Sequence, residues 1–252
     1  MNRDGQVAEL AGRIRDSSRI TVLTGAGVSA ASGVPTFRGH EGLWRNYSPQ
    51  QLATTEAFRR DPKLVWEWYN WRRELISKCR PNDAHSVLAA WSRRYQGFTL
   101  ITQNVDGLHE MASTENIVRF HGSIWEVFCW EECFSSPARW CDDRVPMPYI
   151  PPHCPYCRGL LRPGVVWFGE GIDSAVLERS WQAARCDIFL TVGTSAVVYP
   201  AAGLVDVARS HGAFTVEINP EVTPGTGAVD LVIQGRAEEV LPIIESRLDG
   251  KS

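Results

Sequence analysis

Apolar segments of strand length alternate with helical patterns along most of the chain. The strand candidates, which are rich in β-branched and apolar residues, are 19–24, 98–102, 116–120, 186–192, 213–218 and 230–234. Val7, Leu10 and Ile14 share one helical face before the first strand, and a last helix with apolar residues between 240 and 248 follows the final one. This alternation predicts an α/β fold with a mainly parallel sheet.

Two long stretches interrupt the alternation. Residues 34–82 have a helical pattern and are rich in Trp, whereas residues 122–164 contain five of the seven cysteines and seven prolines. We therefore predict that both are insertions and that together they form a second, smaller unit.

Composition and charge exclude several classes of protein. The chain has 252 residues with 44% hydrophobic and 22% charged residues, which is a globular composition and argues against intrinsic disorder. Its net charge of −3, spread along the chain, disfavours nucleic acid as the main partner. Asp4 and Glu9 stand where a signal peptide would be basic and then apolar, and the apolar runs are short. We expect a cytoplasmic protein without a membrane partner.

Polar and glycine-rich clusters follow four of the predicted strands, at residues 25–33, 103–106, 193–195 and Asn219. Because ligands of open parallel sheets bind at the carboxyl ends of the strands, these clusters predict one site at one edge. A glycine turn between a strand and a helix lets backbone N–H groups approach a pyrophosphate, although a tight turn without a ligand has the same pattern. The acidic residue that dehydrogenases carry about 20 residues further on is missing. A dinucleotide site without hydride transfer is the better interpretation.

Six motifs occur in the order that one known family shows. They are GAGVSAASGVPTFRG (25–39), TQNVDGLH (102–109), FHGS (120–123), VVWFGE (165–170), TVGTSAVVYPAA (191–202) and INP (218–220). Together they resemble the sirtuin family of NAD-dependent protein deacylases, over residues 15–245.

The resemblance implies that NAD binds as a co-substrate along these motifs. The residues that it implies are Gly25, Ala26, Gly27, Ser29, Thr36, Phe37, Arg38, Gln103, Asn104, Asp106, Gly193, Thr194, Ser195, Asn219 and Ala237. Thr36, Phe37 and Arg38 would belong to a loop that closes over the ribose. Gln103, Asn104 and Asp106 would line the nicotinamide pocket, while a strand-end turn or a helix cap is the structural alternative for Asn104 and Asp106.

His121 follows a predicted strand and would be the catalytic residue. A single histidine at a strand end is often only structural, but the ordinary imidazole pKa suits a general base at neutral pH. In the mechanism that the resemblance implies, the acyl oxygen of an acyl-lysine attacks C1′ of the nicotinamide ribose and nicotinamide leaves. The imidazole then removes a proton from a ribose hydroxyl, which attacks the imidate carbon. The products are the free lysine, nicotinamide and an O-acyl-ADP-ribose.

The segment VVWFGE is expected to bind the protein substrate. The family pairs this segment with the substrate backbone as an added strand, which points to Val166, Trp167, Phe168 and Gly169. A buried core strand is the structural alternative, since these apolar side chains would also fit inside the protein.

Four cysteines have the spacing of a structural zinc site. Cys154 and Cys157 form a Cys-x2-Cys pair, and Cys129 stands where the family places its first ligand. The family's next ligand position falls on Glu132, so Cys133 is the predicted fourth ligand and Cys141 is a possible substitute. The alternative is loss of the metal, with ordinary buried thiols.

Tyr69 and Arg72 are the candidates for acyl selection. They are three residues apart within 63–76 and hence adjacent on one helical face. An exposed stacking pair is the alternative interpretation, and Arg73 has the pattern of a solvated charge. The Tyr-x-x-Arg pair resembles that of the sirtuin class that recognises acidic acyl groups. The physical basis of that recognition is that a guanidinium group matches the geometry of a carboxylate.

The predicted protein is therefore a monomeric NAD-dependent lysine deacylase that removes acetyl groups as well but prefers succinyl- and malonyl-lysine in protein substrates, with one structural zinc. A Rossmann-like domain is expected from residues 1–33, 83–121 and 165–252, and a small helical and zinc-binding domain from 34–82 and 122–164. A general deacetylase, a mono-ADP-ribosyltransferase and a non-catalytic NAD sensor are the alternatives. The sensor is disfavoured because a pure binding protein would not need His121, Asn104 and Asp106 together.

Overall fold

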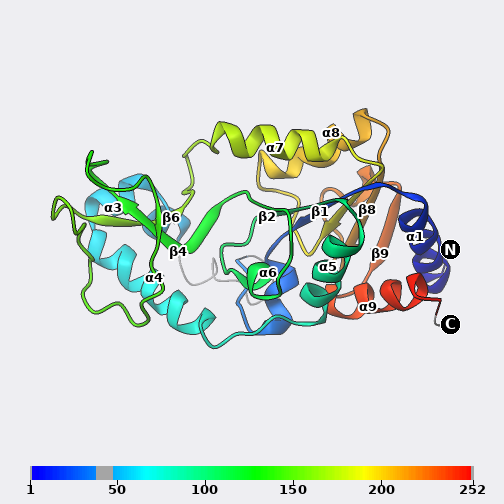
Figure 1. The fold of residues 1–252 in the computed structure, drawn as a ribbon, viewed down its shortest axis with the longest axis horizontal. Coiled ribbons are helices and arrows are strands. Elements are labelled where there is room, and N and C mark those ends of the chain that lie inside the picture. The colour runs from blue at the N-terminus through cyan, green and yellow to red at the C-terminus, as the bar shows by residue number, and fades with distance from the viewer. Residues whose placement is uncertain (1, 38–47, 251–252) are drawn as a thin grey trace.

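A six-stranded parallel sheet forms the larger part of the molecule in a computed structural model, which describes residues 2–37 and 48–250 (Figure 1). The strand order is β3-β2-β1-β7-β8-β9. The bounds are β1 Arg19–Thr24, β2 Gly97–Thr102, β3 Ile117–Arg119, β7 Ile188–Val192, β8 Phe214–Asn219 and β9 Leu231–Gln234. All six predicted strands are confirmed, with ends that differ by at most two residues.

Helices cover both faces of this sheet, as expected for a Rossmann-like fold (Figure 1). On one face lie α1 (Arg3–Asp16), α5 (Asp83–Arg94) and α9 (Ala237–Leu248), and on the other lie α7 (Ser174–Ala184) and α8 (Leu204–Ser210). The short α6 (Leu108–Met111) follows β2 along the chain. β1 is buried on both faces after its first residue, which explains why its sequence lacks the alternation of a half-exposed strand.

The rest of the chain forms a smaller unit at the other end of the molecule (Figure 1). Its helices are α2 (Pro49–Leu52), α3 (Thr55–Arg60) and α4 (Pro62–Ile76), and its antiparallel sheet contains β4 (Gly122–Cys129), β5 (Trp140–Cys141) and β6 (Leu161–Val165) in the order β5-β4-β6. We call the six-stranded sheet with its helices the sheet region, and these six elements the small region. The sequence predicted helices and a metal site here but not the sheet.

This omission has a physical cause. The pairing of β4 with β6 is irregular between Gly122 and Val127, β5 has two residues, and β6 contains Pro163 and Gly164. Such strands lack the alternating or continuous apolar pattern that identifies a strand in a sequence. In contrast, the helical segment 63–76 agrees with α4 within one residue. The helix begins at Pro62, and the Asp61 carboxylate caps it by accepting from Leu64 N at 2.9 Å.

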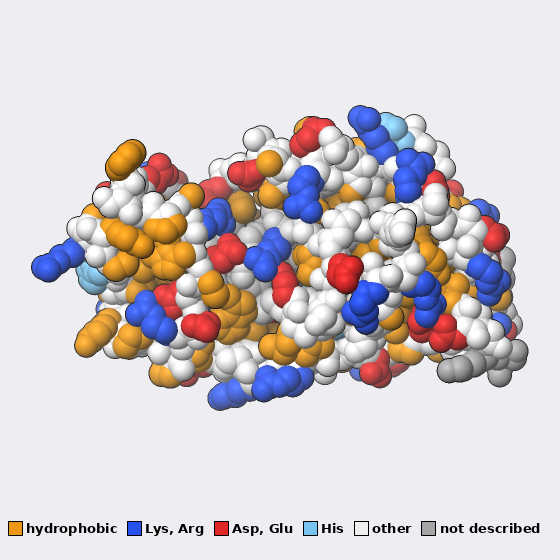
Figure 2. All heavy atoms as spheres, in the orientation of Figure 1, with side chains coloured by type: hydrophobic (Ala, Val, Ile, Leu, Met, Phe, Trp, Pro, Cys, Tyr) orange, Lys and Arg blue, Asp and Glu red, His pale blue; other side chains and the backbone are white. Residues whose placement is uncertain are grey.

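The small region has a hydrophobic core of its own, in which Phe58, Trp66, Ile124 and Trp167 take part. Charged side chains of both signs are interspersed over the face in Figure 2, whereas hydrophobic side chains gather on the small region at the left. Among the described helices, none combines the length and the apolar character that crossing a membrane requires. The predicted domain boundaries stay predictions.

Candidate functional site

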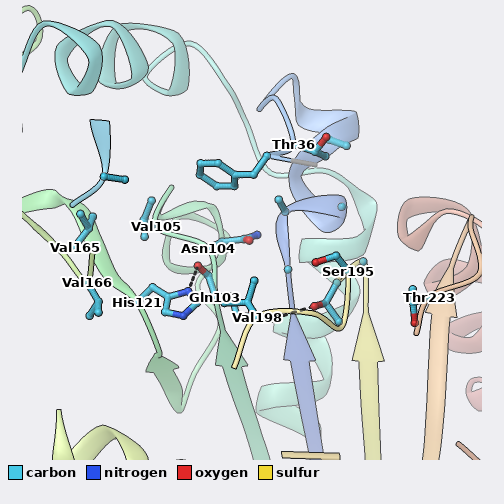
Figure 3. Close-up of a pocket in the computed structure, with 18 of the residues that line it drawn as sticks. Thr36, Gln103, Asn104, Val105, His121, Val165, Val166, Ser195, Val198 and Thr223 are labelled. Carbon is cyan, nitrogen blue, oxygen red and sulfur yellow. Dashed lines mark hydrogen bonds between the residues drawn. The ribbon is translucent and has the colours of Figure 1, made fainter. Parts of the chain in front are cut away.

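A cavity of about 890 Å³ lies between the two regions, at the carboxyl ends of β1, β2, β7 and β8 (Figure 3). The predicted NAD-binding residues on its wall are Gly25, Ala26, Gly27, Thr36, Phe37, Gln103, Asn104, Gly193, Thr194, Ser195, Asn219 and Ala237. The predicted catalytic and substrate-binding residues on its wall are His121, Tyr69, Arg72, Val166, Trp167, Phe168 and Gly169. Arg38 lies outside the described residues. Polar clusters far apart in the sequence therefore meet in one place, as the strand-end argument predicted.

The glycine turn after β1 packs directly against the turn after β7. Gly27 N donates to the Gly193 carbonyl at 2.8 Å, and a Cβ added to Gly193 would lie 2.6 Å from Val28 N. Gly193 also has φ of +60°, so this contact requires glycine both for space and for conformation. The turn continues as a 3₁₀ helix, Ala26–Ser32, where an α-helix is usual in dinucleotide folds.

Ser29 and Asp106 lie beneath the cavity wall rather than on it. The Ser29 hydroxyl donates to Asp106 Oδ2 at 2.8 Å and accepts from Asn104 Nδ2 at 3.2 Å. Asp106 also accepts from Leu108 N, two residues on, so the predicted alternative of a strand-end turn describes one of its two contacts. Burial raises the pKa of Asp106. Asn104 is thereby held with its amide at the cavity edge.

Two buried histidines support this network, and the sequence analysis missed them. The rings of His85 and His109 are 4.7 Å apart; His85 Nε2 lies 3.4 Å from Ser29 Oγ, and His109 Nε2 lies 3.1 Å from Thr24 Oγ1. Burial lowers the pKa of His85 to about 4 and that of His109 well below its usual value, so both are neutral. The contacts join residues from four separate segments, and no spacing in the sequence indicates them.

Gln103, Thr194 and Asn219 connect three strand ends. Gln103 Nε2 donates to Thr194 Oγ1 at 3.0 Å, and Asn219 Nδ2 donates to the Thr194 carbonyl at 2.8 Å. These bonds fix the turns after β2, β7 and β8 relative to one another. The cavity wall on this side is therefore built largely from main chain held by short polar side chains.

His121 stands in the turn between β3 and β4, where the chain passes from the sheet region into the small region (Figure 3). Its Nδ1 lies 3.2 Å from the Gln103 carbonyl oxygen. A carbonyl can only accept, so Nδ1 carries the hydrogen and Nε2 keeps its lone pair. Burial lowers the pKa of His121, an effect that the bond to Gln103 partly offsets. The imidazole is therefore in its basic, neutral form at neutral pH.

Tyr69 and Arg72 are buried, at 2% and 6% exposure, so the alternative of an exposed stacking pair is wrong. The Arg72 guanidinium carbon lies 4.8 Å from the ring centre of Phe37 and 5.0 Å from that of Trp68. Burial lowers the pKa of Arg72 and raises that of Tyr69 to about 12. The cavity wall thus presents a desolvated cation beside a protonated phenol.

Arg73 was predicted to be a solvated charge, and this prediction is wrong. Its side chain is fully buried, Nε donates to the Ile124 carbonyl at 2.8 Å, and Nη1 lies 3.7 Å from Asp142 Oδ1. α4 packs against β4 and β6, which buries this side of the helix as well. Helical periodicity alone could not show that a second sheet would cover α4.

The segment after β6 joins both regions. Val166 N donates to the His121 carbonyl at 3.0 Å, and Phe168 N donates to the Ala53 carbonyl at 2.9 Å. Glu170 and Arg162, which the sequence analysis missed, form a two-pronged ion pair with distances of 2.6 and 2.9 Å. The extended, partly buried geometry agrees with both interpretations of VVWFGE, a core segment and a surface for a peptide.

The sulfur atoms of Cys129, Cys133, Cys154 and Cys157 lie within 4.8 Å of one another. The Cys129–Cys157 and Cys133–Cys154 sulfur distances are 3.5 and 3.8 Å. Tetrahedral zinc with Zn–S bonds of about 2.3 Å would place its sulfurs about 3.8 Å apart. The four thiols therefore fit a structural Zn²⁺. Cys133, and not Cys141, completes this group of four thiols.

Comparison with known proteins gives consistent results. The model of the Sir2 family matches residues 25–200. An NAD-dependent protein deacylase of Aquifex aeolicus is 49% identical over 88% of this chain and 92% of its own length. A solved Sir2 homologue–NAD complex is 42% identical, with a TM-score of 0.88 over 97% of this chain and 94% of that one. A Sir2 complex with a p53 peptide and NAD⁺ is 26% identical, with a TM-score of 0.82 over 97% and 98%.

Proposed function

The chain belongs to the Sir2 family, and from this premise we propose that it is an NAD-dependent protein-lysine deacylase. One observation carries the proposal: His121, the glycine turn and the pair Tyr69 and Arg72 line a single cavity, although they come from distant parts of the chain. The named activity of the relatives and the NAD and peptide in the solved Sir2 complexes support it. The chemistry of the cavity residues is consistent with each step.

The sheet region would hold NAD, and the small region would hold the acyl-lysine. Bound NAD supplies a ribose carbon from which nicotinamide can leave. The backbone N–H of Ala26, in the glycine turn, would face the pyrophosphate, with Gly27 beside it; the Gly27 N–H itself bonds the Gly193 carbonyl. Asn104, fixed through Ser29, would bond the nicotinamide carboxamide, and Asn219 with Ala237 would contact the adenosine side. Thr36 and Phe37 would cover the ribose.

His121 would act as the general base. Its Nε2 has a free lone pair because Nδ1 donates to Gln103, and its lowered pKa keeps it neutral. It can therefore accept the proton of a ribose hydroxyl as that hydroxyl attacks the acyl carbon. The backbone of Val166 to Gly169 would pair with the substrate peptide, which places the acyl-lysine stem next to His121.

The preferred acyl group would carry a carboxylate, as in succinyl- and malonyl-lysine. Arg72 is a buried cation on the cavity wall, and burial alone disfavours its charged form. A carboxylate would pair with the planar guanidinium fork and offset that cost, whereas an acetyl group would leave Arg72 without the partner. Tyr69, one helical turn earlier, would add a second donor.

The test is NAD-dependent turnover of one peptide that carries acetyl-, malonyl- or succinyl-lysine, followed by mass together with nicotinamide release. We expect the acidic acyl groups to react at least tenfold faster, which is about 1.4 kcal/mol in barrier height. Arg72→Met should remove this preference, and Arg60→Met, which changes an exposed arginine of α3, should keep it.

Other outcomes identify the alternatives. Faster turnover of acetyl-lysine would support a general deacetylase and contradict the acidic preference. Transfer of label from NAD to an acceptor protein would support mono-ADP-ribosyl transfer. NAD binding without turnover of any peptide would support a sensor. The monomeric state, the cytoplasmic location and the lack of a nucleic-acid or membrane partner stay predictions.

A further inference from the structure

Trp167 contacts the phenol of Tyr69 from across the small region. Trp167 Nε1 lies 3.0 Å from Tyr69 Oη, and both side chains are buried on the cavity wall at 2% exposure. The two residues are 98 positions apart in the sequence. No motif connects them, and the contact exists only because the segment after β6 packs against α4.

The direction of this hydrogen bond is fixed by chemistry. An indole N–H can only donate, so the Tyr69 oxygen must accept. The phenol keeps its own hydrogen, since burial raises its pKa to about 12. Within the described part of the chain, Trp167 is the hydrogen-bond partner that the structure gives this hydroxyl. With its acceptor side occupied by Trp167, the phenol has its O–H available as a donor to a ligand.

The indole is itself held in place by charged neighbours. The Arg162 guanidinium carbon lies 3.6 Å from the centre of the Trp167 ring, and Glu170 Oε2 accepts from Trp167 N at 2.8 Å. Arg162 and Glu170 are paired with each other through two hydrogen bonds. The orientation of the Tyr69 hydroxyl therefore depends on a rigid, buried group and not on a mobile surface side chain.

We propose that Trp167 is a positioning residue for acyl selection: its indole N–H directs the Tyr69 hydroxyl so that the O–H donates to the carboxylate of an acidic acyl group. This inference rests on the proposed function. A carboxylate oxygen would then accept from Tyr69 while the other pairs with Arg72. The hydrogen bond of Trp167 also polarises the phenol and makes it a stronger donor.

A double-mutant cycle on the ratio of kcat/KM for succinyl- over acetyl-peptide tests this role. Trp167→Phe removes the N–H and keeps an aromatic ring, and we expect it to lower the ratio about fivefold, mainly through KM for the succinyl peptide. In the Tyr69→Phe background the same change should leave the ratio unaltered, because no hydroxyl remains to be directed. A purely structural role of the indole would act equally in both backgrounds.

A second variant guards against a packing defect. Benzothienylalanine at position 167 keeps the bicyclic ring and lacks the N–H, so it should reproduce the loss seen in Trp167→Phe. An unchanged ratio with this residue, while the unsubstituted protein prefers succinyl-lysine, would overturn the inference and leave the proposed function intact. A ratio of one or less in the unsubstituted protein would overturn the proposed acyl preference and the inference together.

Discussion

The two sides of the cavity are built by different means. The sheet region positions its side with main chain, through the turns that follow β1, β2, β7 and β8 and the contact of Gly27 with Gly193. The small region positions its side with buried charges. Among the described residues the buried arginines are Arg72, Arg73 and Arg162, and all three lie in the small region.

This contrast follows from what each fold can provide. The parallel strands of the sheet region satisfy one another's backbone groups and place their ends at a common edge, so only short side chains are needed there. The small sheet is antiparallel, with irregular pairing of β4 and β6, so its strands do not all end at one edge. Arginines connect α4, β4 and the segment after β6 instead. The guanidinium groups of these arginines pack against aromatic rings. The shortest distance from a guanidinium carbon to a ring centre is 3.6 Å, for Arg162 over Trp167. The proposed binding of NAD suits the first construction, and the proposed selection among acyl groups suits the second.

The largest effect is expected at the residue between the two regions. His121→Ala should lower kcat by a factor of about 10² to 10⁴, the range for loss of a general base. NAD affinity should change much less than kcat, because the imidazole supplies a single bond, to the Gln103 carbonyl, whereas Gln103 also bonds Thr194 and the glycine turn bonds Gly193. Stopped assays with succinyl-peptide, alongside calorimetric titration of NAD, measure both quantities. Undiminished deacylation would contradict the role of His121.

Loss of one zinc ligand should affect the small region far more than the sheet region. Cys129→Ser leaves three thiolates. We expect the free energy of unfolding to fall by about 4 kcal/mol or more, which corresponds to a fall in Tm of roughly 12 °C. Metal analysis and thermal unfolding measure the change. Cys141→Ser is the matched control, since Cys141 lies outside the cluster. Equal metal content in both variants would argue against the four-cysteine site.

A methyl group added at Gly193 should destabilise the sheet region. Gly193→Ala requires a residue with a Cβ at φ of +60° and 2.6 Å from Val28 N, so we expect a loss of about 2 kcal/mol or more in unfolding free energy. KM for NAD should rise, with a smaller change in KM for the peptide. In contrast, Gly171→Ala adds a methyl to open space and should be neutral. A larger rise in KM for the peptide than in KM for NAD would contradict the proposal that the sheet region holds NAD and the small region holds the acyl-lysine.

The smallest effect concerns pH. The pKa of His121 is lowered by burial, and a base works only while it is neutral, so kcat/KM should stay constant down to pH values below 6.5 and then fall tenfold per pH unit. Initial rates between pH 4.5 and 8, with stability checked by return to pH 7, give the profile. An acid limb centred above pH 6.5 would show that the imidazole is more exposed in the working enzyme.

The same contrast explains what could be predicted from the sequence. The strands of the sheet region and the polar turns after them follow from local apolar pattern and glycine placement, which is why β1 and the clusters at 25–33 and 193–195 were recognised. The cysteine spacing likewise gave the metal cluster. Arg73 bonds the Ile124 carbonyl, 51 residues away, and Trp167 bonds Tyr69 across 98 residues. Such contacts depend on how separate elements pack, and a local pattern does not contain them.

The position of His121 in the crossing from β3 to β4 has a mechanical consequence. A hinge is the point that moves least when two bodies swing about it. If the small region were to rotate about this crossing, the end of β4 that carries Cys129 would move far while the imidazole, next to the start of β4, stayed almost still. The cavity could then open for a protein substrate and close around it while the position and orientation of His121 Nε2, the proton acceptor, stayed the same.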